Sequence, residues 1–251
     1  GVCMWLARLH NDVTMQAAAR DLEEVLAIEE RLNRRLFTDI DNLMFAALVG
    51  VQQENDESII AQSHFDRVVE NNPALQTLYV LDATGQVRWN PQSQVTLSAD
   101  TITALHNNLS SLEPDDTIHV LTPPPSIDTS LIYVMRAIYD TSDQISGAAI
   151  AVLSAEMWSE SLMSFFVDPD EYLGAIVDEN GFILTTFSYQ PSIIGKQFPT
   201  NITASQNTSS AQIISSISSD QPVLTQFRKI QDIPVYIRIE AIGVDGTLQF
   251  D

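Results

Sequence analysis

Arg136 is a single positive charge inside an otherwise apolar run, Leu131 to Tyr139, whose residue types predict a buried β-strand. A charge in such a strand is costly unless it is paired or faces a cavity. Two interpretations therefore stay open: a structural salt bridge, with Asp140 or Asp82 as the partner, or a role in binding a ligand.

Several aromatic and polar residues flank the same predicted sheet. Aromatic side chains with a few converging polar groups are typical of small-molecule cavities. We therefore expect a ligand-binding site there, although alternation along a strand turns about half of these side chains away from any one face. The candidates are Tyr79, Arg88, Trp89, His119 and Tyr133, together with Arg136.

Sequence motifs for catalysis and for cofactor binding are missing. The chain has no phosphate-binding glycine loop, no Gly-x-Ser-x-Gly and no His-Glu-x-x-His, so we expect no cofactor. The four histidines are too scattered for a metal motif, and the single cysteine, Cys3, excludes an internal disulfide. A hydrolase whose triad combines a serine, His106 or His119 and an aspartate would leave no local signature and stays an alternative.

The elements that must position these residues begin with a long helix. From Asn11 to Val51 the chain has no proline and no glycine before Gly50, and apolar residues recur at helical spacing. Such a helix is about 60 Å long at 1.5 Å per residue, which is enough to span two modules. A second helix is predicted for 58–71, ended by Asn72-Pro73.

Two hairpins repeat one pattern about 96 residues apart, at Leu78–Trp89 and Ala175–Thr185. Each has an apolar run, an Asp-x-x-Gly turn and a second apolar run, which indicates a structural duplication. The remaining expected elements are a helix at 98–112, strands at 130–139, 147–153, 223–229 and 235–241, a short helix after Trp158, and a loop with a short helix within 201–220.

The chain is strongly acidic, with 12 Lys and Arg against 33 Asp and Glu and a formal charge of −21. This charge repels phosphate backbones, so nucleic acid is not an expected partner. The apolar opening from Gly1 to Leu9 carries Trp5 and has the character of the outer end of a membrane helix. An ordinary amphipathic helix start explains it equally well.

In order and spacing, these motifs resemble the double Cache family over nearly the whole chain. The resemblance rests on Leu-Asp82-Ala-Thr-Gly85, Met-Arg136-Ala-Ile-Tyr-Asp140, the run that starts at Gly147, and Ala-Ile-Val-Asp178-Glu-Asn-Gly181. It implies an α+β fold with two PAS-like modules, each a central antiparallel sheet flanked by helices. The implied division is a long helix over 1–56, a membrane-distal module over 57–166 and a membrane-proximal module over 167–251.

The resemblance also implies a function: the extracytoplasmic, periplasmic sensor of a bacterial transmembrane receptor, not itself an enzyme. Its output would be a histidine kinase, a diguanylate cyclase or phosphodiesterase, or a chemotaxis domain. The resemblance further implies flanking membrane helices outside this chain, a homodimer in the full receptor and a small-molecule ligand in the distal module. A module driven by a partner protein, without a small ligand, is the main alternative.

Two family details bear on the ligand. Arg136 and Asp140 match the family's Arg-x-x-x-Asp strand pattern, which adds Asp140 to the ligand-binding candidates, although Ala137 replaces the usual proline. Members that bind amino acids carry an Arg-x-Trp-Tyr run and a later aspartate. Here Arg88-Trp89 continues into Asn90, and Val152 stands near the aspartate position, which argues against an amino-acid ligand.

Overall fold

The computed structural model describes residues 2–52, 58–121, 130–163, 170–197, 211–219 and 221–245. It divides the chain into two compact units. Unit A comprises Arg34–Trp158, and unit B comprises Gly1–Asn33 and Ser159–Asp251.

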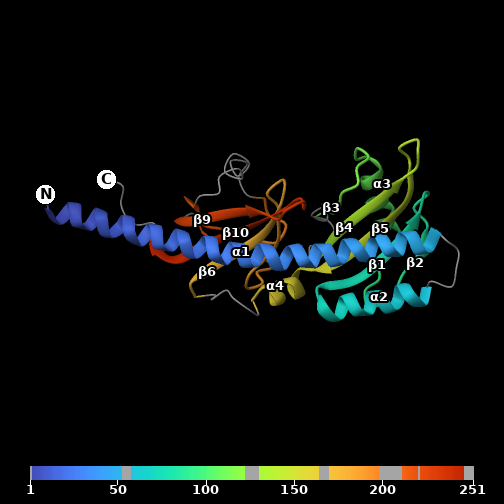
Figure 1. Ribbon diagram of the computed structural model, residues 1–251, viewed down its shortest axis with the longest axis horizontal. Helices are drawn as coiled ribbons and strands as arrows, with labels where there is room; N and C mark the ends of the chain where they lie inside the picture. Colours follow the sequence, from blue (N-terminus) through green and yellow to red (C-terminus); the bar gives the residue numbers. More distant parts are fainter. Residues whose placement is uncertain are drawn as a thin grey trace. The chain divides into compact units, whose positions relative to one another are not determined.

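The N-terminal helix α1 is longer than predicted, from Val2 to Gln52, and contributes residues to both units (Figure 1). Its helical spacing predicted a buried stripe, which is confirmed at Leu22, Leu36, Ile40, Leu43 and Ala47, whereas Leu32 is 39% exposed. Leu22 and Leu26 are fully buried in unit B, and Phe37, Ile40 and Met44 are fully buried in unit A. Helix stability here comes from packing of this apolar face.

Unit A is built on a five-stranded antiparallel sheet of order β2-β1-β5-β4-β3. The predicted 58–71 helix and the first hairpin are confirmed. Helices α2 and α3 lie on opposite sides of the unit in Figure 1. Its elements after α1 are α2 (Ser58–Asn71), β1 (Leu75–Asp82), β2 (Val87–Trp89), α3 (Ala99–Ser110), β3 (His119–Leu121), β4 (Leu131–Tyr139) and β5 (Ile145–Ser154).

Unit B repeats this topology with a sheet of order β7-β6-β10-β9-β8. The same strand order in both sheets confirms the α+β fold with two PAS-like halves. Helix α4 (Ala155–Met163) contributes to both units. The strands are β6 (Tyr172–Asp178), β7 (Ile183–Thr186), β8 (Gln212–Ser215), β9 (Pro222–Lys229) and β10 (Val235–Asp245).

The segment 201–220 differs from its prediction. Gln212–Ser215 forms edge strand β8, paired with β9, in place of a short helix. The three-residue spacing of Ala211, Ile214 and Ile217 suggested a helical face, but it is too short to outweigh the β-branched residues that pair with a neighbouring strand. Residues 201–210 and 220 lie outside the described part of the chain.

No described helix combines the length and the apolar content that crossing a bilayer requires.

Candidate ligand-binding face

One face of the unit A sheet packs against helix α3, and we call it the α3-facing side. Side chains alternate along a strand, and cross-strand partners share a face. A buried cluster on this side joins residues of α3 to alternate residues of β1, β4 and β5. It contains Tyr79, Leu81, Tyr133, Met135, Ala137, Ala148, Ile150 and Val152 from the sheet and Ile102, Leu105 and Leu109 from α3.

The sequence candidates Tyr79 and Tyr133 both lie on this side and are almost fully buried. The Tyr79 hydroxyl accepts a hydrogen bond from the Leu97 amide at 2.9 Å. Leu97 precedes Ser98, the residue that caps α3 by accepting a hydrogen bond from the Thr101 amide. Tyr79 therefore ties the start of α3 to the sheet.

His119 joins the same side from strand β3, because its cross-strand partner is Met135. Its Nε2 lies 3.1 Å from Oδ1 of Asp115. Burial alone would raise the pKa of Asp115, but hydrogen bonds from Thr117 and the nearby His119 outweigh it and hold that pKa below its ordinary value. Asp115 is therefore an anion at neutral pH.

Sequence reasoning missed Asp115 and Tyr139, and it considered His106 only as a triad histidine. Tyr139 packs against the cluster, and its buried hydroxyl has no hydrogen-bond partner among the described residues. Burial and the charge of Asp115 both raise the pKa of Tyr139. His106 of α3 is 9% exposed, and its Nε2 also has no partner within the described ranges. Tyr133 and Tyr139 are six residues apart on one strand, and this even spacing could have predicted that both side chains lie on the same face of the sheet.

Arg136 lies on the opposite side of the sheet and contacts α1. One guanidinium nitrogen lies 2.5 Å from Asp41, and another lies 2.5 Å from Asp116. The guanidinium carbon lies 5.4 Å from the centre of the Phe45 ring. The salt-bridge interpretation is thus correct in kind, but the suggested partners Asp140 and Asp82 were wrong, because both of those carboxylates serve hairpin turns.

The Asp140 carboxylate closes the turn between β4 and β5. Its Oδ1 accepts hydrogen bonds from the amides of Ser142 and Gln144 at 2.7 and 3.0 Å. The structure does not bring Asp140 together with the two tyrosines. Asp82 and Asp178 make the same amide contacts in their own hairpins, where Gly85 and Gly181 take the positive φ of the turn.

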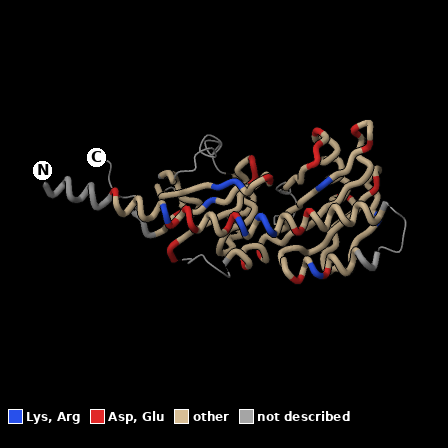
Figure 2. The backbone as a smooth tube through the Cα atoms, in the orientation of Figure 1, with Lys and Arg blue, Asp and Glu red and all other residues tan. Residues whose placement is uncertain are grey.

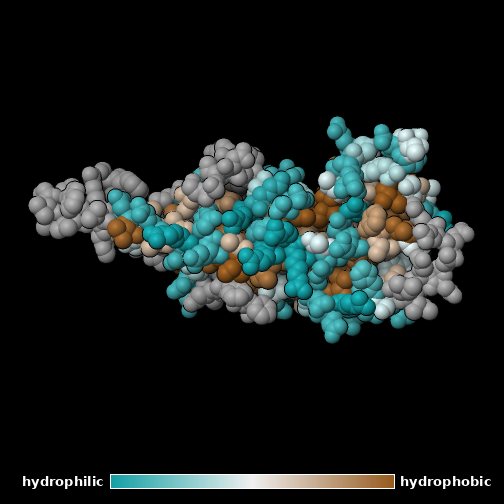
Figure 3. Space-filling view, in the orientation of Figure 1, coloured by the Kyte–Doolittle hydropathy of each residue, from teal (hydrophilic) through white to brown (hydrophobic). Residues whose placement is uncertain are grey.

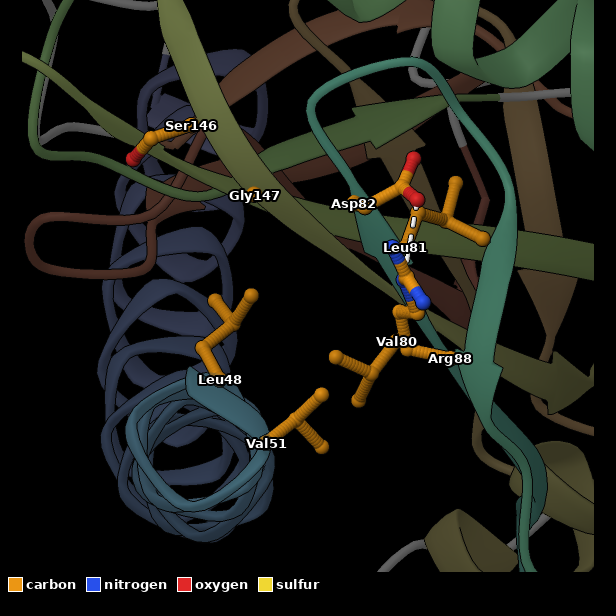
Figure 4. A pocket seen from close by; sticks show the side chains of 8 residues that line it. All are labelled: Leu48, Val51, Val80, Leu81, Asp82, Arg88, Ser146 and Gly147. Carbon is orange, nitrogen blue, oxygen red and sulfur yellow. Dashed lines mark hydrogen bonds and ion pairs between the residues drawn. The ribbon is translucent and has the colours of Figure 1, made fainter. Parts of the chain in front are cut away.

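Arg88 and Trp89 also lie away from the α3-facing side. Trp89 pairs with Val80, which puts it on the side that faces α1. Arg88 Nε lies 2.9 Å from Asp82 Oδ2. This pair borders a pocket of about 370 Å³ (Figure 4), into which α1 projects apolar side chains. The pocket is lined by Leu48, Val51, Val80, Leu81, Asp82, Arg88, Ser146 and Gly147.

Unit B carries a buried ion pair on its β10 strand. Arg238 lies 2.7 Å from Glu240, and each side chain is 2% exposed. Ser216 and the Ile217 amide donate hydrogen bonds to the Glu240 carboxylate, while Arg238 donates to the Ser215 carbonyl. This network joins β10 to the chain around β8, so we assign it a structural role.

Within the described residues, no group of three or more His, Cys, Asp or Glu side chains is placed to hold a metal ion.

Comparison with solved structures places the fold among extracellular sensor domains. The extracellular domain of rpHK1S-Z16, a protein assigned as a histidine kinase, matches with a TM-score of 0.70 and 15% identity over 91% of this chain and 96% of its own. The ligand-binding domain of the Pseudomonas fluorescens chemoreceptor CtaA, in complex with L-isoleucine, matches at 0.63 with 14% identity over 92% and 95%. A domain assigned to the sensory box/GGDEF family from Vibrio parahaemolyticus matches at 0.57 with 13% identity over 90% and 96%.

No protein-family model matches the sequence, and no curated protein matches it significantly. The structural similarity establishes the fold, which this chain shares with the extracellular domain of rpHK1S-Z16, the ligand-binding domain of the chemoreceptor CtaA and the domain from Vibrio parahaemolyticus.

Proposed function

We propose that the chain is the extracytoplasmic small-molecule sensor of a bacterial transmembrane receptor. The observation that carries this proposal is a shared two-sheet fold over about nine-tenths of this chain and of each sensor domain compared. Those domains come from a histidine kinase, a chemoreceptor and a GGDEF protein, so one fold serves several outputs. In this chain the same fold has the role of detecting a ligand and has no catalytic role of its own.

The receptor context follows from the same proposal. The chain faces the periplasm between membrane helices that are not part of it, and the whole receptor is a homodimer. Its output is a histidine kinase, a diguanylate cyclase or phosphodiesterase, or a chemotaxis domain. Apolar surface shows over the C-terminal part of α1 in Figure 3, where Phe45 is 49% exposed, and this supports a role for α1 in pairing.

The ligand site is the α3-facing side of unit A. Tyr79, Tyr133 and His119 gather there from three strands, and Tyr139, whose buried hydroxyl has no partner among the described residues, packs against the same cluster. The hydrolase alternative is less favoured for His119, because its Nε2, the atom that a triad histidine presents to its serine, lies 3.1 Å from Oδ1 of Asp115.

The signal reaches α1 through Arg136. This side chain starts on β4, whose neighbouring residues Met135 and Ala137 face the ligand side, and it ends on Asp41 of α1. A shift of β4 therefore changes a contact on the helix. For this route to work, the ligand must bind two arrangements of sheet and helix with different affinities.

A thermal-shift screen of the chain tests the proposal. The panel comprises amines, organic acids, amino acids, nucleobases and divalent metals. We expect at least one compound to raise the melting temperature in proportion to the logarithm of its concentration, and Tyr133→Ala to reduce that rise. A flat response to every compound would instead support a module driven by a partner protein.

A further inference from the structure

Cationic side chains are scarce in unit A. It contains five Arg and no Lys against sixteen Asp and Glu, a formal charge of −11 (Figure 2). Between Arg67 and Lys196 the sequence has only two cationic residues, Arg88 and Arg136.

Neither of these arginines is available to a ligand on the α3-facing side. Arg88 pairs with Asp82 beside the pocket that faces α1, and Arg136 pairs with Asp41 and Asp116. The remaining three arginines lie on α1 and α2, and the cluster beneath α3 is built from α3 and the sheet strands. A carboxylate bound on that side would therefore lack an Arg or Lys partner from unit A.

The groups that do lie there favour the opposite charge. Asp115 is an ionised carboxylate. Its charge acts on Tyr139, whose aromatic ring is of the kind that attracts cations. The Tyr139 hydroxyl and His106 Nε2, both buried, can accept hydrogen bonds from an ammonium group. The negative field of the unit also raises the local concentration of cations.

The energetic cost of burying a charge without an opposite charge beside it decides between anionic and cationic ligands. A carboxylate buried without a counter-charge is strongly disfavoured, whereas an ammonium group beside the Asp115 carboxylate and the Tyr139 ring gains at both contacts. We propose that the α3-facing side of unit A binds an organic cation, with Asp115 as its counter-charge and Tyr139 as its aromatic contact. This inference rests on the proposed sensor function and names its ligand class.

A charge-matched ligand series tests it on the intact chain. Putrescine, γ-aminobutyrate and succinate share a four-carbon backbone and carry a double positive charge, a zwitterion and a double negative charge. Choline and its neutral isostere 3,3-dimethylbutan-1-ol add a second matched pair, and tyramine with 3-(4-hydroxyphenyl)propionate adds an aromatic one. Binding is measured by isothermal titration and by thermal shift.

We expect one or more of the three cations to bind at least tenfold more tightly than their neutral or anionic counterparts. Asp115→Asn should weaken that binding at least tenfold. Asp116→Asn is the matched control, because Asp116 contacts Arg136 and not His119, and it should leave cation binding within about twofold. Melting curves of both variants establish that they are folded.

The other outcomes separate the two proposals. If succinate, γ-aminobutyrate or the propionate binds and the cations do not, the cation inference is wrong and the sensor proposal stands. Cation binding that Asp115→Asn leaves unchanged would likewise overturn the inference while keeping direct sensing. If no compound of this series or of the broader screen binds, both proposals are overturned.

Discussion

Asp115 and Asp116 are adjacent in the chain, yet their carboxylates contact side chains that emerge from opposite faces of the unit A sheet. Asp115 contacts His119 on the α3-facing side, and Asp116 contacts Arg136, which also holds Asp41 of α1. This dipeptide is a physical link between the proposed ligand side and the helix that leaves the unit. Because the two residues share a peptide bond, a backbone shift at Asp115 also moves Asp116.

Arg136 and Asp41 should be energetically coupled, because their side chains form an ion pair. Arg136→Gln is expected to lower the free energy of unfolding by about 1–3 kcal/mol, since it removes hydrogen bonds between charged groups at a site where Arg136 is 8% exposed. Urea unfolding of Arg136→Gln, Asp41→Asn and the double variant gives the coupling energy. Arg88→Gln, whose side chain is 61% exposed, is the control and should cost under about 1 kcal/mol. Equal losses for the two arginines would contradict this interpretation.

Glu29 should make stability depend on pH in the direction opposite to that of most carboxylates. It is fully buried, its oxygens have no hydrogen-bond partner in the described residues, and burial raises its pKa to about 7. Between about pH 4.5 and 7 the unfolded chain releases this proton while the folded chain keeps it, so stability falls as pH rises, by about 3 kcal/mol in total.

Glu29→Gln should remove that dependence and leave a flatter stability curve across the same pH range. Unfolding by urea at pH 4.5, 5.5, 6.5 and 7.5 measures it for both proteins. The assignment fails if the wild-type curve and the variant curve stay parallel over this range.

Arg238 should matter far more for stability than Arg228, on the neighbouring strand. Arg238→Gln leaves Glu240 buried without its counter-charge, and the expected loss is about 3–5 kcal/mol. Arg228 pairs with Glu23 at 2.9 Å, but its side chain is 35% exposed, so Arg228→Gln should cost about 1 kcal/mol or less. Thermal and urea unfolding compare the two. Similar losses would mean that the buried pair contributes no more than a surface one.

Gly174 should not tolerate a methyl group. A Cβ there would clash with the ring of Phe187, which is 1% exposed, so something must shift and Gly174→Ala is expected to cost about 1–3 kcal/mol or more. Gly147 is the matched control in the other sheet, because a Cβ there would first meet Leu48 at 3.4 Å, an ordinary contact. Gly147→Ala should stay within about 1 kcal/mol of wild type. Unfolding curves in which the two variants coincide would contradict the packing argument.

Periodicity predicted most of the fold. The long helix, the two matching hairpins and the central strands each carry a repeat of 3.6 or 2 residues over enough length to be read. Strand β8 was mistaken for a helix because a four-residue edge strand shows too little alternation, and its pairing with β9 is a contact between separate segments.

The site was only partly predictable, for geometric reasons. Tyr133 and Arg136 are three residues apart on one strand, so alternation alone puts them on opposite faces. The partner of Arg136 could not be read from the sequence, because Asp41 is 95 residues away on a helix with no local signal for the contact. Asp115 was missed because it lies in a loop, where no periodicity indicates which way a side chain points.

The most direct test of the sensor assignment is amide hydrogen exchange of the chain with and without the tightest-binding compound from the screen. We predict slower exchange in α3 and in residues 115–121, which border the α3-facing side, with a further change in α1 near Asp41. Protection confined to unit B, or unchanged exchange throughout the chain, would contradict the proposal that this side of unit A detects the ligand.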